Sequence, residues 1–118
     1  KKSELNAVLQ IIAFIVAGSL LIALVAIGQI RYVEPTLWPA LKYNTMVVPL
    51  IILANALIFI AFTRATALSY NLPGVVGFQV GIYTLALALL SVLLLNGTIS
   101  ARTLVGIGLI MFGAALAR

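Results

Sequence analysis

Side chains that could carry chemistry are few in this sequence, and their types argue against catalysis. The chain has two acidic residues, Glu4 and Glu34, and it contains neither histidine nor cysteine. A metal site or a carboxylate pair needs several such groups close together, and a catalytic nucleophile needs an adjacent base. We therefore expect no enzymatic activity, no metal site and no cofactor, and a disulfide is impossible.

Two uncharged amides and a tyrosine stand inside long apolar stretches. Asn55 lies in the middle of one stretch, whereas Gln79 and Tyr83 lie one helical turn apart in another. An amide in hydrocarbon commonly forms a hydrogen bond with a neighbouring helix. Alternatively, these side chains line a polar path or contact a lipid headgroup. We take Asn55, Gln79 and Tyr83 as candidates for a substrate path.

The basic residues stand mostly alone, although the net charge is +5. No basic stripe with interleaved aromatic residues is present, so we expect no nucleic-acid partner. Trp38 and Tyr43 are of the types that anchor helices at headgroup level. Arg31, Glu34 and Lys42 form either exposed ion pairs of little energetic value or a phosphate-binding patch. Arg31, Trp38 and Lys42 are thus the candidates for headgroup contact.

The elements that carry these residues are predicted by the distribution of charge. Apolar residues make up 64% of the chain and charged residues 8%, against about 25% charged in a typical soluble domain. No charge occurs in residues 5–30, 43–63 or 65–101. A helix crosses a hydrocarbon core with about 20 apolar residues. The sequence therefore predicts an all-α integral membrane bundle, one domain with four transmembrane helices at about 5–30, 45–62, 75–95 and 100–117.

Turn-forming residues separate the predicted helices. Residues 31–39 hold two prolines and read as a connection, and residues 69–74 read as a turn that ends in Pro73-Gly74. Asn96-Gly97 closes the third helix, and Ser100 is a candidate N-cap of the fourth. The first apolar stretch is longer than the core of a signal peptide, so we expect it to be a true span.

Basic residues are divided almost evenly between the two ends of such a bundle. Four spans place Lys1, Lys2, Arg64 and Arg118 on one side of the membrane and Arg31, Lys42 and Arg102 on the other. The difference gives only a weak orientation signal. Two interpretations stay open: the bias is simply small, or copies insert in both directions and pair antiparallel.

Small residues recur at spacings of three and four in the third predicted helix. They are Gly74, Gly77, Gly81, Thr84, Ala88 and Ser91. Such a stripe lets helix backbones approach closely in a membrane. The stripe serves either packing within the chain or, alternatively, the wall of a substrate cavity or a flexible kink.

Several motifs in order resemble the small multidrug resistance transporters, a family within the drug/metabolite transporter superfamily. Leu37-Trp38-Pro39 precedes the second helix, and Tyr70-Asn-Leu-Pro73 leads into the glycine-containing third helix. Asn96-Gly97 stands where the family has a short turn, and Gly106 and Gly113 have the seven-residue spacing of its dimerising fourth helix. The similarity covers residues 36–118.

This resemblance implies a four-helix subunit that works as a dimer by alternating access. Helices one to three would enclose the cargo, and Gly106 and Gly113 of helix four would hold the two subunits together. The implied partner is either a second copy, which can pair in antiparallel orientation, or a related membrane subunit. Membrane lipids would surround the pair. The membrane implied is a bacterial-type inner (plasma) membrane.

The sequence departs from this family at the residues that couple transport to protons. The family's drug exporters carry a glutamate within helix one, and that position falls near Leu21 or Val25 here. The family's tryptophan in helix three is replaced near Gly81. Phe78 stands near a family tyrosine, which adds it to the candidates for the substrate path. Without an ionisable group in the spans, a proton relay of the usual kind is not expected.

A Gly28-Gln29 pair in the first helix resembles the four-helix subunits that flip aminoarabinose-linked undecaprenyl phosphate. Those relatives also lack the exporter's glutamate. We therefore predict a small transporter or a flippase subunit for lipid-linked cargo. The alternative is a non-transporting structural subunit of a larger membrane complex, and a third possibility is a cation/proton exporter.

Overall fold

The chain folds into helices joined by short connections in the part that the structure describes. The computed structural model describes residues 2–117, and within them it contains five α-helices and no strand. The helices are α1 (Lys2–Tyr32), α2 (Leu37–Met46), α3 (Val48–Ala67), α4 (Leu72–Leu94) and α5 (Ala101–Ala117). The all-helical prediction is thus confirmed for the described residues. Lys1 and Arg118, which the charge comparison used, lie outside them.

Three helices are long and apolar enough to cross a membrane. These spans are Ser3–Tyr32, Val48–Ala67 and Leu72–Leu94, with 30, 20 and 23 residues. Each reaches the roughly 20 residues that a hydrocarbon core requires. α5 is apolar as well but has only 17 residues. The architecture is that of an integral membrane protein with three such helices, and the fourth span stays a prediction.

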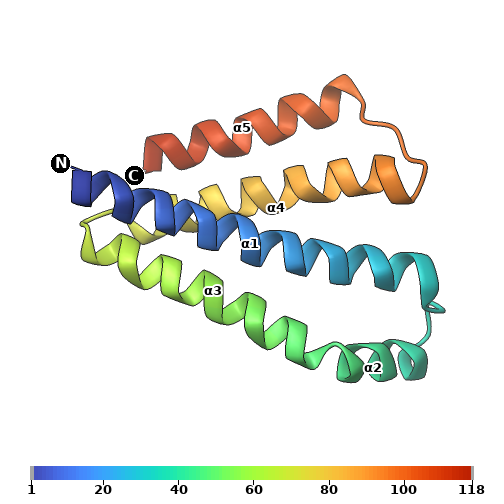
Figure 1. Cartoon of the computed structure of the whole chain (residues 1–118). Helices are drawn as coiled ribbons and strands as arrows, with labels where there is room; N and C mark the ends of the chain where they lie inside the picture. Colours follow the sequence, from blue (N-terminus) through green and yellow to red (C-terminus); the bar gives the residue numbers. More distant parts are fainter. Residues whose placement is uncertain (1, 118) are drawn as a thin grey trace.

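The four long helices lie side by side, with both described ends of the chain at the same end of the molecule (Figure 1). α1 packs against α3 and α4, and α5 packs against α4. The order across the molecule is therefore α3, α1, α4, α5. This arrangement measures 49 × 35 × 21 Å along its principal axes. Because α3 and α5 lie at the flanks, much of their apolar surface is exposed.

Large side chains of α1 fill the space beside small ones of α3. Ile11 and Ile15 form a buried cluster with Ala61 and Ala65. The two helices approach closely at Gly18, where a Cβ would lie 2.9 Å from the backbone oxygen of Ala54. Close approach at small residues is how apolar helices gain packing energy in lipid, where burial itself contributes little.

The second predicted helix corresponds to α3, and a short helix that was not predicted, α2, precedes it with a break at Val47 between them. α2 ends at Met46 and α3 begins at Val48, whereas the sequence predicted one helix over residues 45–62 after a connection at residues 31–39. Pro49 explains the break, because it lacks an N–H and is tolerated only in the first turn of a helix. α3 then continues past the predicted end, to Ala67.

The remaining helix ends follow turn and capping chemistry. α4 begins at Leu72, three residues before the predicted start, with Pro73 in its first turn. After α4, Asn96 has a φ of 55°, a left-handed conformation that asparagine adopts more readily than most residues. The Ser100 hydroxyl accepts a hydrogen bond of 3.2 Å from the Thr103 N–H, which is the predicted N-cap contact of α5.

Candidate functional site

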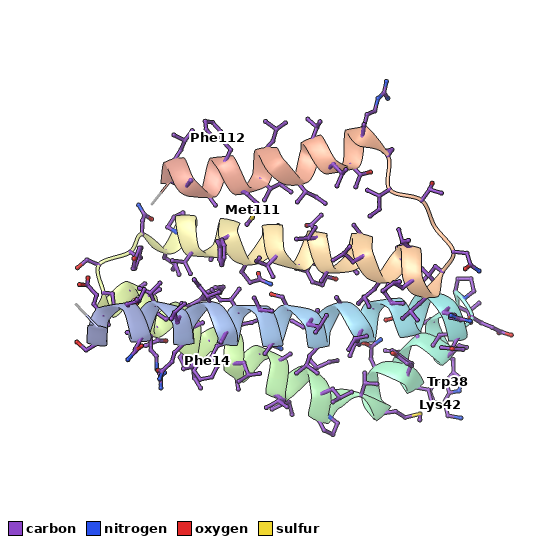
Figure 2. The ribbon with its side chains drawn as sticks, turned by 45° about the horizontal axis from the view of Figure 1, so that its top comes forward. Phe14, Trp38, Lys42, Met111 and Phe112 are labelled. Carbon is purple, nitrogen blue, oxygen red and sulfur yellow. The ribbon has the colours of Figure 1, made fainter. Side chains whose placement is uncertain are left out.

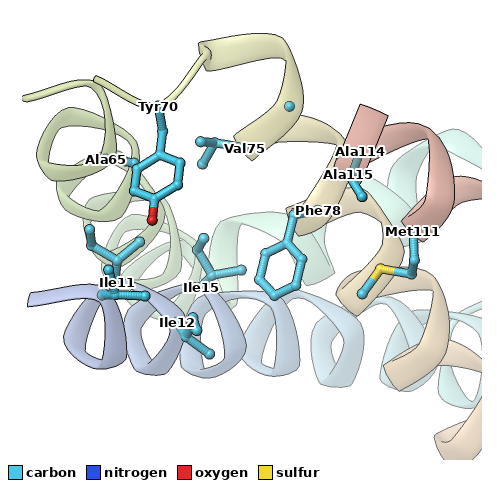
Figure 3. A pocket seen from close by; sticks show the side chains of 12 residues that line it. Ile11, Ile12, Ile15, Ala65, Tyr70, Val75, Phe78, Met111, Ala114 and Ala115 are labelled. Carbon is cyan, nitrogen blue, oxygen red and sulfur yellow. The ribbon is translucent and has the colours of Figure 1, made fainter. Parts of the chain in front are cut away.

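An apolar cavity lies between α1, α4 and α5, near the end of the molecule that holds the two described chain ends. Its volume is about 370 Å³. Figure 3 shows Ile11 and Ile15 of α1 facing Val75 and Phe78 of α4 across it, with Met111 of α5 at one side. Volumes of 300–1,000 Å³ are typical of small-molecule sites. Because the lining is almost wholly apolar, the cavity suits a hydrocarbon chain.

Small residues leave this space open. Gly74 of α4 and Ala114 and Ala115 of α5 line the cavity, and Ala65 of α3 lines it from the other side. Larger residues at these positions would fill part of the volume. Tyr70, in the connection between α3 and α4, also contributes to the lining, and it is the lining residue with a hydroxyl group (Figure 3).

A pair of polar side chains lies deeper in the bundle, just beyond the cavity-lining residues of α1 and α4. The Gln79 Nε2 donates a hydrogen bond of 3.1 Å to the Ser19 Oγ. Ser19 is fully buried, and it follows the cavity residue Ile15 by about one helical turn. Gln79 directly follows the cavity residue Phe78. The apolar cavity is thus followed, toward the membrane centre, by a hydrogen-bonded pair that joins α1 to α4.

The structure brings together two of the four predicted path residues. Phe78 lines the cavity, and Gln79 forms the bond to Ser19. Tyr83 is partly buried one turn further along α4. Asn55 lies elsewhere, exposed on α3. Ser19 was missed by the sequence reasoning, although a lone hydroxyl inside the longest apolar stretch is a signal of the same kind as Gln79.

Some of the predicted packing glycines lie between two helices of the chain, and the others lie beside open space on α5. A Cβ on Gly77 would lie 3.2 Å from the Ala114 Cβ, and one on Gly81 would collide with Met111 of α5. These two glycines, together with the cavity residue Gly74, therefore shape the α4–α5 boundary. Gly106 and Gly113 of α5 have open space where a Cβ would stand. Their predicted role in a dimer contact stays a prediction.

The predicted headgroup residues lie at the opposite end of the molecule from the cavity. Arg31 donates a hydrogen bond to the Leu94 carbonyl at the end of α4, and its guanidinium also lies over the Tyr32 ring. Trp38 and Lys42 are exposed on α2, the helix at this end (Figure 2). Lys42 borders a second, more open hollow of about 280 Å³ together with Glu34. The headgroup patch and the cavity are therefore separate sites.

Two contacts that the sequence did not indicate bind α1 to the elements beside it. The Tyr43 hydroxyl donates a hydrogen bond of 2.8 Å to the Val25 carbonyl, so this residue packs on α1. At the other end, the Arg64 Nη1 donates a bond of 3.0 Å to the Gln10 Oε1. The Arg64 guanidinium also lies 5.2 Å from the centre of the Phe14 ring, a cation–π contact.

Comparisons with known proteins find no family model, no curated protein and no solved structure that matches the chain. Among residues 2–117 no three histidine, cysteine or acidic side chains gather as metal ligands would. The class of protein is therefore defined by the structure: a small helical membrane protein with an apolar cavity and a polar pair in which Ser19 is buried and Gln79 is half-buried.

Proposed function

We propose that this protein is a small membrane transporter or a flippase subunit whose cargo carries an apolar chain. The observation that carries the proposal is the cavity of about 370 Å³, with almost wholly apolar walls, beside the Ser19–Gln79 pair. A soluble cargo would need polar groups in such a site to fix its orientation. The tail of an amphipathic lipid needs no polar protein groups. Its headgroup needs them only along the path by which it crosses the membrane.

The mechanism we propose is alternating access in a dimer. The polar pair offers an amide and a hydroxyl in the middle of the bundle, where a crossing headgroup would otherwise find only hydrocarbon. An uncharged pair of this kind exchanges hydrogen bonds with a headgroup and needs no proton. The resemblance to the small multidrug resistance family supports Gly106 and Gly113 as the dimer contact and a bacterial-type inner membrane as the location.

Filling the cavity is the direct test. Ala115 lines the cavity and is exposed, so Ala115→Phe should occupy it without disturbing the buried contact of Ala114 with Gly77. Leu116→Phe is the matched control, because Leu116 is 72% exposed and does not line the cavity. Purified protein in vesicles with fluorescent phospholipid in one leaflet reports lipid movement. Native mass spectrometry reports lipid that stays bound.

We expect wild type and Leu116→Phe to move the phospholipid and to retain it, and Ala115→Phe to lose both by tenfold or more. Equal movement by all three proteins, or none by wild type with phospholipid or polyprenyl phosphate, would contradict the proposal. A requirement for a pH gradient would instead support a proton-coupled exporter.

A structural subunit is the second candidate, favoured by the exposed apolar surfaces of the flanking helices. Phe59 of α3 is 68% exposed, and Leu109 and Phe112 of α5 are 63% and 61% exposed. Such surfaces face either lipid or further subunits. Stable co-purification with an unrelated membrane protein, together with no lipid movement by the isolated chain, would favour this role.

A further inference from the structure

Asn55 is an amide exposed on the outside of α3, close to the middle of the helix. The helix runs from Val48 to Ala67, so Asn55 lies about 4 Å along the axis from its midpoint. The side chain takes part in none of the side-chain hydrogen bonds formed among residues 2–117. Several other polar side chains in the spans do have partners: Gln79 bonds Ser19, and Thr63 bonds the carbonyl one turn before it.

A lone amide at this depth is costly in lipid. Hydrocarbon offers no hydrogen-bond partner, and an unpaired amide in an apolar medium loses several kcal/mol relative to water. Lipid headgroups lie roughly 15 Å away, at the surface of a core about 30 Å thick. Another polypeptide within the membrane can supply both the donor and the acceptor that this amide lacks.

The surroundings of Asn55 form a surface suited to a helix. The buried side of α3, which contains Ala54 and Ile58, faces α1. On the exposed side, Ile52 and Phe59 are 63% and 68% exposed and lie within one turn of Asn55. Ala56 is exposed between them and leaves room for a second backbone to approach.

We propose that this surface, made of Ile52, Asn55, Ala56 and Phe59, is a contact between two copies of this chain in which the Asn55 amides bond each other. A primary amide carries both donors and an acceptor, so two amides related by a twofold axis satisfy each other. Parallel copies bring the two Asn55 residues to the same depth, whereas antiparallel copies would place them about 8 Å apart along the axis, because Asn55 lies about 4 Å from the midpoint of α3. The contact is therefore one between parallel copies. This α3 contact stands apart from the α5 contact and from any transport activity.

Cysteine cross-linking tests the contact directly, because the native sequence contains no cysteine. Ile52→Cys and Phe59→Cys, which both keep the Asn55 amide, should each form a cross-linked dimer in membranes with an oxidant or a short bifunctional thiol reagent. Leu53→Cys is the matched control: it is 50% exposed at nearly the same depth, but about 160° around the helix from Asn55. Cross-linking at residues 52 and 59 no stronger than at residue 53 would overturn the proposal.

A second measurement isolates the amide. Asn55→Leu keeps the side-chain size and suits a lipid-facing helix, so the fold should persist, which circular dichroism checks. Fluorescence energy transfer between labelled copies in vesicles should show a dissociation constant about three- to thirtyfold higher for this variant. An unchanged or lower dissociation constant would overturn the Asn55 contact. Loss of lipid movement with this contact intact would instead count against the proposed function alone.

Discussion

Ser19 and Gln79 join α1 to α4 through one hydrogen bond of 3.1 Å in a region otherwise made of apolar side chains. The bond fixes the rotation of the two helices relative to each other, because both side chains must face the same boundary. The hydrophobic pattern does not determine this rotation when a helix is apolar on all sides, so the bond adds to what close packing at small residues sets. The pair therefore contributes specificity as well as stability.

Breaking this pair should reveal a measurable coupling. Ser19→Ala and Gln79→Leu, alone and combined, form a double-mutant cycle, and we expect a coupling of about 0.6–2 kcal/mol in the free energy of unfolding. Reversible unfolding in mixed detergent measures it. Thr84→Val is the control partner for Ser19, since the Thr84 hydroxyl donates to the Val80 carbonyl of its own helix. A Ser19–Gln79 coupling no larger than the Ser19–Thr84 coupling would contradict the assignment.

The sequence predicted Gln79 and Asn55 alike as path candidates, but it did not predict that Gln79 bonds a neighbouring helix while Asn55 is exposed. Both are amides in apolar stretches, and hydrophobicity on all sides of α3 and α4 gives no indication of which face turns inward. That direction is set by close approach at small residues, such as Gly18 against Ala54 and Gly77 against Ala114. A single sequence shows where the small residues are but not which helix lies opposite, so Ser19 could not be paired with Gln79.

Helix boundaries were easier to predict where they depend on residues that are close together in the sequence. The charge-free stretches correctly located the long helices, and Ser100 caps α5 as its residue type suggested. The short helix α2 was missed because Pro39 and several polar residues made it look like a connection. Proline is tolerated in the first turn of a helix, and Pro39 occupies that place in α2.

The end of α4 depends on a residue from α1. Arg31 donates to the Leu94 carbonyl, where the final carbonyl groups of a helix have no partner within it. A cation at a helix C-terminus is worth about 0.3–1 kcal/mol at an exposed position. We expect Arg31→Gln to speed amide hydrogen exchange at Leu95 and Gly97, which both donate to the Ser91 carbonyl, by about two- to fivefold.

Arg102→Gln serves as the control for this element, because Arg102 is exposed in the first turn of α5 and forms none of the side-chain hydrogen bonds recorded among residues 2–117. Exchange at Leu95 and Gly97 should stay at the wild-type rate in this variant. Equal acceleration by both substitutions would show that net charge, and not the bond to Leu94, governs the end of α4.

The whole molecule is organised around α1, with α4 beside it and α3 and α5 at the flanks (Figure 1). A single copy therefore leaves the outer surfaces of α3 and α5 without protein neighbours. Each surface has a different character: α3 presents the Asn55 amide, and α5 presents Gly106 and Gly113 with open space beside them. Two distinct contacts of this kind would allow assemblies larger than a dimer.

The depth of α5 follows from its contacts with α4. Ala114 meets Gly77, which lies five residues after the start of α4, so the end of α5 reaches the level at which α4 begins. The 17 residues of α5 extend about 25 Å, slightly less than a hydrocarbon core of about 30 Å. The connection after Leu94 supplies the remaining length. We therefore predict that α5 crosses the membrane despite its shortness.

Single cysteines at three exposed positions test this crossing: Ser69, between α3 and α4; Thr98, between α4 and α5; and Ala117, at the end of α5. A membrane-impermeant thiol reagent applied to oriented vesicles should label Ala117→Cys from the side that labels Ser69→Cys, and Thr98→Cys from the other. If copies insert in both directions, each variant should be labelled by about half from either side, in line with the weak charge bias. Labelling of Ala117→Cys from the side of Thr98→Cys would show that α5 returns without crossing, and the molecule would then have three spans.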